Sequence, residues 1–482
     1  MIFNSIDFAL FLPLVFSLYW LFNNNLRIQN IILLVSSYYF YASWDWRFLS
    51  LIIFSTLVDF YAGVCLSKYK SISLRKFILG LSIMLNLGLL GFFKYYNFFV
   101  EQFINAFTLL GQDVSVNSLN IILPVGISFY TFQSMSYTID VYRKNIVNSP
   151  DLISFSSYVS FFPQLVAGPI ERASQLLPQF SQKKYFNYTQ SVNGMRQILW
   201  GLFKKMVIAD NCAEIANVLF ENPTQYSSTS LFLGAVFFAF QIYGDFSGYS
   251  DIAIGTARLF GFNLMKNFST PYFSRDIAEF WRRWHISLSS WFRDYLYIPL
   301  GGSRVNLKKN IRNVFVVFLV SGLWHGANWT FIVWGAVHAI FFLPLLILKK
   351  NRTHLEITDK GRLFPSLSSL IGMATTFLIT TMAWVFFRSK SIGEAVIYFK
   401  QMFSYKLFSF PQIVEETNVK ICLVFLFVFI SVEWLGRNHE FAIEKIDQYF
   451  GRAMRWAIYA FIIFLIGMYT PTQQIPFIYF QF

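Results

Sequence analysis

Residues 313–348 read NVFVVFLVSGLWHGANWTFIVWGAVHAIFFLPLLIL, and this stretch contains no Asp, Glu, Lys or Arg. As one helix it would extend about 54 Å at 1.5 Å per residue, whereas the hydrocarbon core of a bilayer is about 30 Å thick. The stretch must therefore break, and Gly322 and Gly326, on either side of His325, are the expected place. Non-helical backbone at membrane depth is tolerated only beside protein or a water-filled cavity. The break therefore predicts an internal cavity.

The composition of the whole chain is typical of a membrane protein. Of the 482 residues, 55% are hydrophobic and only 13% are charged, against about 25% charged residues in a soluble domain. A spanning helix needs about 20 mostly apolar residues, so the sequence predicts roughly eleven to thirteen membrane segments in a single multi-pass domain, residues 1–482. The candidates lie near 7–22, 28–43, 47–66, 77–99, 118–139, 152–169, 195–220, 230–255, 312–325, 328–348, 364–387, 418–435 and 456–471. Prolines and glycine in 161–169 predict a broken or re-entrant segment there.

The formal net charge of +14 indicates an anionic partner. No soluble basic module is visible, so nucleic acid is not expected, and the charge is interpreted as cytoplasmic loops facing lipid headgroups. The densest basic cluster, 275–312, is placed on the cytoplasmic side. The three cysteines lack C-x-x-C spacing, and H-E-x-x-H, P-loop and dinucleotide motifs are absent. Neither a metal site nor a bound cofactor is expected.

Two of the five histidines lie in unusual, aromatic-rich contexts. His325 lies inside the chargeless stretch, where ionisable residues are costly and usually mark function. Imidazole is also well suited to remove a proton from a hydroxyl near neutral pH. The alternative is a buried histidine that bonds a neighbouring helix. His285, in WRRWHISL (281–288), is a second candidate, and a structural role at the membrane interface is equally compatible with its neighbours.

The segment QIYGDFSGYSD (241–251) places polar groups near or inside a span. On a helix, Gln241 and Asp245 share one face, and Ser247 and Asp251 share another. Such groups often supply hydrogen bonds between membrane helices. Lining of a cavity for a polar substrate, and a path for protons or cations, are the alternatives. We include Asp245, Ser247 and Asp251 among the candidate cavity residues, together with two neighbours of His325: Trp324 and Asn328.

Several blocks of this sequence resemble the membrane-bound O-acyltransferase (MBOAT) family, in its bacterial alginate O-acetyltransferase-like branch. The blocks are 161–170, 241–261, 280–302, 320–335 and the tail PFIYFQF (476–482). The resemblance implies an all-α polytopic core with broken helices around a central funnel. It also implies that His325 is the main catalytic residue and that His285 lies near the reaction centre. Tyr479 matches a tail tyrosine thought to relay the acyl group, with an aromatic membrane anchor as the alternative.

The implied function is transfer of an acyl group, most simply acetyl, from a cytoplasmic thioester to hydroxyls of a cell-surface or secreted polysaccharide. The donor would be acetyl-CoA or a carrier-bound acyl thioester. In a relay version an extracytoplasmic SGNH-type acetyltransferase partner would complete the transfer. The expected location is the bacterial cytoplasmic (inner) membrane. Two alternatives remain open: a proton- or cation-coupled transporter that uses Asp245 and Asp251, and a noncatalytic subunit of a polysaccharide export complex.

Overall fold

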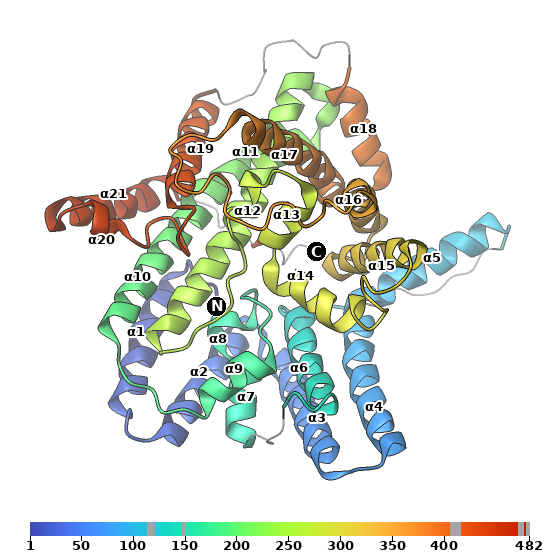
Figure 1. The fold of residues 1–482 in the computed structure, drawn as a ribbon, viewed down its shortest axis with the longest axis vertical. Coiled ribbons are helices and arrows are strands. Elements are labelled where there is room, and N and C mark those ends of the chain that lie inside the picture. Colours follow the sequence, from blue (N-terminus) through green and yellow to red (C-terminus); the bar gives the residue numbers. More distant parts are fainter. Residues whose placement is uncertain (113–118, 120, 147–150, 405–415, 471–476, 479–482) are drawn as a thin grey trace. The chain divides into compact units, whose positions relative to one another are not determined.

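The computed structural model describes residues 1–482 except 113–118, 120, 147–150, 405–415, 471–476 and 479–482. Within the described residues the elements are all helices, joined by turns and loops, with no β-strand (Figure 1). The predicted all-α class is therefore confirmed. The chain divides into two compact units: unit 1 comprises 1–191 and 256–265, and unit 2 comprises 192–255 and 266–482. The organisation as a single domain stays a prediction.

Unit 1 contains the N-terminal helices. They are α1 (Ile6–Leu21), α2 (Leu26–Asp45), η1 (Trp46–Phe48), α3 (Leu49–Lys68), α4 (Ile72–Leu90), η2 (Gly91–Tyr95), α5 (Tyr96–Leu109), α6 (Ile127–Tyr142), α7 (Leu152–Ser160), α8 (Phe162–Leu165) and α9 (Ala173–Phe180). A buried polar group joins α3 to α4, because the Asp59 carboxylate accepts hydrogen bonds from Ser82 Oγ at 2.6 Å and from Asn86 Nδ2 at 2.9 Å. Such bonds hold apolar helices in register inside a membrane.

Unit 2 carries most of α10 and α12 and everything after them. Its elements are α10 (Tyr188–Leu202), η3 (Phe203–Ala209), α11 (Asp210–Glu221), η4 (Pro223–Gln225), α12 (Ser228–Leu259), η5 (Pro271–Phe273), α13 (Ile277–Arg283), α14 (Ile286–Phe292), η6 (Arg293–Tyr297), α15 (Leu307–His325), α16 (Trp329–Ile347), α17 (Leu367–Arg388), α18 (Ile392–Met402), α19 (Glu416–Gly436), α20 (Ile446–Tyr449) and α21 (Arg452–Tyr469). Both η3 and η6 are π-helical, a form that is frequent at functional sites.

Seven helical stretches of the described chain are long and apolar enough to cross a membrane. They are Leu26–Lys68, Ile72–Leu109, Ser228–Leu259, Trp329–Ile347, Leu367–Arg388, Asn418–Gly436 and Arg452–Tyr469. The protein is therefore a multi-pass membrane protein. The predicted number of eleven to thirteen membrane segments stays a prediction, because the count of seven leaves out shorter apolar helices such as Ile6–Leu21.

Two predicted segments are interrupted by their own prolines and glycines. The region near 152–169 is broken into α7 and α8 by non-helical backbone at Phe161, as its composition predicted. The segment predicted near 118–139 begins its helix only at Ile127. Pro124 precedes the helix and Gly126 is left-handed with φ 76°, a conformation that glycine adopts at low cost.

The chargeless stretch folds into a hairpin of α15 and α16, which lie side by side (Figure 1). The helix α15 ends at His325, Gly326 is extended, and the Asn328 side chain caps α16 by accepting from Thr330 N at 3.0 Å. A Cβ at Gly322 would collide with the carbonyl oxygen of Phe331. The predicted break is confirmed and lies at Gly326, whereas Gly322 remains helical because close packing needs it there.

Candidate functional site

His325 is the last residue of α15, at the tip of the hairpin. Its side chain is buried, with only 3% of the residue exposed. The rings of Trp324, Trp334 and Phe387 surround it at centroid distances of 4.9, 5.1 and 5.4 Å. The imidazole therefore faces the interior of unit 2, inside an aromatic shell.

His285 lies at the turn between α13 and α14 and is fully buried. Its backbone is left-handed, with φ 44° and ψ 54°, a conformation that non-glycine residues adopt rarely. Asn267 fixes this turn: its carbonyl accepts from Ile286 N at 2.9 Å and its Oδ1 accepts from Ser287 Oγ at 2.9 Å. Strained backbone of this kind persists only where its surroundings enforce it, and it gathers at functional sites.

The structure brings the two predicted histidines together, with ring centroids 6.2 Å apart. The Trp324 ring lies 5.8 Å from His285 and 4.9 Å from His325, and it packs against both. Burial lowers the pKa of His285 to about 3, so that ring is neutral at physiological pH. A neutral imidazole offers one donor and one acceptor, which suits a hydrogen-bonding role beside a reacting group.

The sequence reasoning missed a third buried histidine, which is the second one in the chargeless stretch 313–348. His338 on α16 is fully buried. Its ring packs against Trp334 at 4.9 Å and Trp281 at 5.0 Å, and lies parallel to Phe280 at 6.1 Å. Among the described residues, neither of its ring nitrogens has a hydrogen-bond partner. The sequence signal that could have revealed His338 is its spacing, because Trp334 and His338 lie four residues apart and therefore on one helical face.

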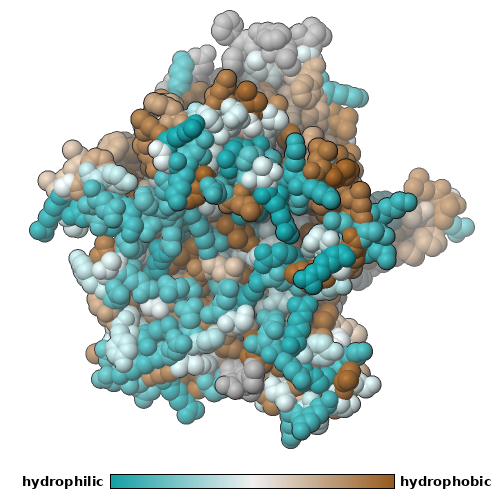
Figure 2. All heavy atoms as spheres, viewed as in Figure 1, coloured by the Kyte–Doolittle hydropathy of each residue, from teal (hydrophilic) through white to brown (hydrophobic). Residues whose placement is uncertain are grey.

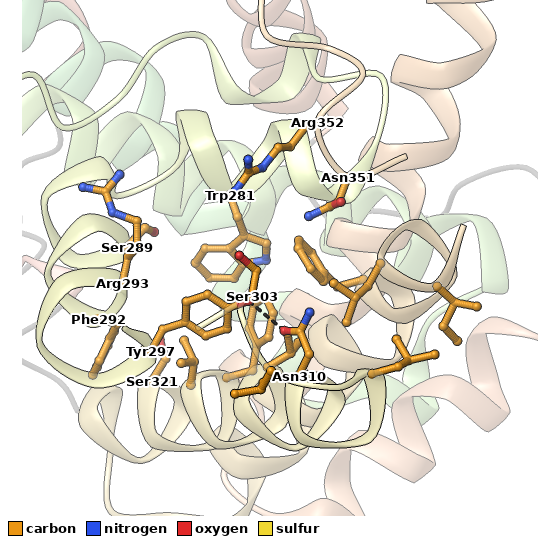
Figure 3. Close-up of a pocket in the computed structure, with 18 of the residues that line it drawn as sticks. Trp281, Ser289, Phe292, Arg293, Tyr297, Ser303, Asn310, Ser321, Asn351 and Arg352 are labelled. Carbon is orange, nitrogen blue, oxygen red and sulfur yellow. Dashed lines mark hydrogen bonds between the residues drawn. The ribbon is translucent and has the colours of Figure 1, made fainter. Parts of the chain in front are cut away.

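A pocket of about 640 Å³ opens in unit 2 beside the hairpin (Figure 3). Its inner lining is mainly apolar, from α14, α15 and α16, including Phe292, Val314, Val317, Phe318 and Phe342. Arg293, Lys349 and Arg352 add positive charge to the lining. Figure 3 shows Arg352 and Asn351 on one side and Ser321 on the other, with Tyr297 donating to Asn310 Oδ1 at 2.7 Å. Figure 2 shows mostly hydrophilic side chains over α13 and α14 and a hydrophobic flank at α16.

Two chains of contacts connect the pocket wall to His325, which is not itself among the lining residues. Ser321 lines it and precedes His325 by one helical turn, so both side chains lie on the same face of α15. Trp281 also lines it and packs 5.7 Å from Trp334, which in turn contacts His325. The pocket can therefore hold an elongated, partly apolar ligand with an anionic end, beside Ser321 of α15.

The aspartates of α12 are paired with consecutive buried lysines of η3. Asp251 lies 2.8 Å from Lys204 Nζ, and Asp245 lies 2.8 Å from Lys205 Nζ. Ser247 and Asp251 line a small polar cavity of about 20 Å³, whereas Asp245 also accepts a hydrogen bond from Ile478 N at 2.7 Å. The prediction that these polar groups bond to neighbouring segments therefore accounts for both Asp245 and Asp251. The lysines were not among the predicted site residues.

The remaining predicted residues have separate outcomes. Trp324 packs against both histidines. Asn328 caps α16 and donates from Nδ2 to the carbonyl of Lys390 at 2.7 Å, so it fixes the hairpin tip. Tyr479 lies outside the described residues, although Phe477 and Ile478 just before it are described and buried.

Comparisons with known proteins agree with this architecture. Residues 142–371 match the family model of MBOAT, the membrane-bound O-acyltransferase family. The chain is 39% identical over 410 residues to probable alginate O-acetylase AlgI of Pseudomonas aeruginosa, covering 84% of this chain and 75% of that protein. It is 36% identical to peptidoglycan O-acetyltransferase of Helicobacter pylori, over 81% of this chain and 77% of that protein. It is 28% identical to teichoic acid D-alanyltransferase of Streptococcus thermophilus, over 55% of this chain and 68% of that protein.

Proposed function

This chain belongs to the membrane-bound O-acyltransferase family, and we propose that it moves an acetyl group from a cytoplasmic thioester towards hydroxyls of a cell-surface or secreted polysaccharide. Acyl transfer by a membrane enzyme follows from the family. The acetyl group and the polysaccharide are inferred from relatives named as alginate O-acetylase and peptidoglycan O-acetyltransferase. We place the protein in the bacterial cytoplasmic membrane, where a donor made inside the cell meets a polymer assembled outside.

One observation carries the proposal: a pocket of about 640 Å³ is lined by basic side chains and by Ser321, which lies on the same face of α15 as His325. A thioester donor of the acetyl-CoA or carrier-bound kind has an anionic phosphate end, a long flexible arm and a reactive carbonyl. Arg352 and Lys349 match the phosphate end, and Phe318 and Val314 match the arm. The reactive carbonyl would then lie towards Ser321 and His325.

In this proposal His325 acts as the general base. It takes the proton of the attacking hydroxyl as the oxygen bonds to the thioester carbonyl, and the thiolate then leaves. Its aromatic shell excludes water, which limits loss of the acyl group to hydrolysis. Backbone amides at the Gly322–Gly326 end of the hairpin would stabilise the oxyanion. His285 would orient donor or acceptor with its neutral ring.

The acceptor hydroxyl has two candidate sources. It belongs either to the polysaccharide or to Tyr479, from which an extracytoplasmic SGNH-type acetyltransferase would pass the group to the polymer. The relay version is supported by the position of the tail, because Phe477 packs 6.0 Å from Phe246, whose ring lies 4.7 Å from His285. Tyr479 follows two residues after Phe477 in the sequence.

The test measures alkali-labile acetate on purified surface polysaccharide from the parent strain, a deletion strain and the complemented strain. The proposal expects the deletion to lose this acetate and the complementing gene to restore it. Equal acetate in the parent and deletion strains would reject a polysaccharide acceptor. Purified protein supplied in parallel with acetyl-CoA or with an acetylated carrier protein then identifies the donor, since only one of them is consumed in a protein-dependent way.

A further inference from the structure

The C-terminal tail is bound to the middle of α12 through a buried carboxylate. Asp245 is 2% exposed, and its Oδ2 accepts a hydrogen bond from the backbone N–H of Ile478 at 2.7 Å, although the two residues are 233 positions apart. Phe477 packs on the same helix, 4.8 Å from Tyr249 and 6.0 Å from Phe246 by ring centroids. Both Phe477 and Ile478 are buried.

The charges around Asp245 explain why the carboxylate needs this donor. Lys205 Nζ lies 2.8 Å from Asp245 Oδ1 and 2.7 Å from Asp210 Oδ1, so one ammonium serves two buried carboxylates. The ammonium is therefore shared between the two carboxylates. A buried carboxylate is stabilised by hydrogen bonds from backbone N–H groups, and Ile478 provides one.

The backbone of η3 places these groups next to α12. Gly244 packs so closely that a Cβ there would lie 2.9 Å from the carbonyl oxygen of Lys204. The same region holds the start of the tail, because Asn211 Nδ2 donates to the carbonyl of Tyr469 at 3.0 Å, at the end of α21. The tail is therefore attached at both sides of the segment 471–476.

From these contacts we infer that Asp245 is a positioning residue that holds the C-terminal tail, through the backbone of Ile478, against the side of the site formed by Phe246 and His285. Its consequence for catalysis depends on the proposed function, because Tyr479 is covalently next to the anchored residue. The anchoring itself does not depend on acyl transfer. It assigns Asp245 a role other than cation binding.

The molecule contains a matched control on the same helix. Asp251 is also buried, it also lies 2.8 Å from a lysine of η3, and Gln197 Nε2 donates to it at 2.8 Å. Its described partners do not include the tail. Asp251→Asn therefore removes a comparable charge from α12 without touching the tail.

The experiment measures a cysteine cross-link between positions 249 and 477 in protein whose Cys65, Cys212 and Cys422 have been replaced by serine or alanine. Adding Asp245→Asn should reduce tail docking, because an amide cannot accept from both Lys205 and Ile478. A hydrogen bond to a charged group corresponds to about a 10- to 150-fold change in the docked-to-released ratio. Adding Asp251→Asn should leave the cross-link unchanged.

Ile478→Pro provides an independent variant, because it removes the N–H donor and leaves α12 intact. It should reduce the cross-link as Asp245→Asn does. Equal cross-linking in the parent, Asp245→Asn and Ile478→Pro proteins would overturn the inference, as would equal losses in Asp245→Asn and Asp251→Asn. If docking responds as expected while no variant changes polysaccharide acetate, the relay through Tyr479 fails and the anchor stands.

Discussion

Replacing His325 by Asn should remove the general base while preserving a polar side chain at the hairpin tip. General-base catalysis contributes about 10²–10⁴-fold, which corresponds to about 3–5 kcal/mol of barrier. The structure indicates where in this range the loss should fall. A hydroxyl oxygen within about 2.6–3.2 Å of His325 can also approach His285, since the two ring centroids are 6.2 Å apart. Because burial lowers the pKa of His285 to about 3, that ring is a weak base and should substitute poorly, so the loss should lie towards about 10⁴-fold.

The assay is acetyl transfer by purified protein in lipid nanodiscs, with protein abundance and melting temperature measured in parallel. His285→Asn and the double variant separate the two rings. If only His325 carries the proton, the double variant loses no more than His325→Asn alone, because residues acting in one step are not additive. His439→Asn, outside the aromatic shell, is the matched control and should keep full activity. Activity of His325→Asn within tenfold of the parent, at equal folded protein, would refute the reasoning.

Three further predictions concern the pocket and the other two buried histidines. Arg352→Gln should raise the donor KM about two- to fivefold and leave kcat unchanged, as expected when one exposed ion pair with the donor is lost. The control is Lys76→Gln, on the exposed surface of unit 1. Equal KM values in the two variants would argue against a donor phosphate at Arg352. His338→Phe should keep or raise the melting temperature, because it removes two buried ring nitrogens that have no hydrogen-bond partner among the described residues. Burying such an atom costs about 1–3 kcal/mol of folding free energy. A lower melting temperature would show that the imidazole is hydrogen-bonded in the fold. His285 has a folded pKa of about 3, below its ordinary value of 6.5, so the unfolded chain binds a proton between these values that the folded protein does not. The free energy of unfolding should therefore fall as the pH drops from 6.5 towards 3, with no contribution above 6.5; melting curves of His285→Gln should show a smaller decline, and an identical decline would contradict the burial argument.

Much of the helical architecture could be predicted from the sequence because it depends on local properties. A chargeless stretch of 36 residues cannot be one straight span, and the position of the break followed from Gly326. Prolines likewise marked the break between α7 and α8. The helix predicted near 118–139 begins later than its apolar composition suggests, because Pro124 and the left-handed Gly126 precede its first residue.

The site was harder to predict because it depends on contacts between distant segments. The contact between His285 and His325 depends on the tertiary structure, whereas the local sequence indicates each histidine only by itself. His338 was overlooked because a histidine in an aromatic run reads as core when considered alone. The partners of Asp245 and Asp251 are not predictable from local sequence, since Lys204 precedes Asp251 by 47 residues and basic residues of a membrane protein usually lie in loops.

The paired lysines of η3 also constrain how the chain enters the bilayer during its synthesis. A lysine at the centre of a translocating helix costs about 2.5–3.5 kcal/mol, so the segment with Lys204 and Lys205 is a poor substrate for insertion by itself. Asp210, which pairs with Lys205, belongs to the same segment, whereas Asp245 and Asp251 lie on α12, the next long apolar helix to leave the ribosome. We therefore expect the segment with Lys204 and Lys205 to stay at the lipid headgroups until α12 has emerged, and the two segments then to enter the lipid together.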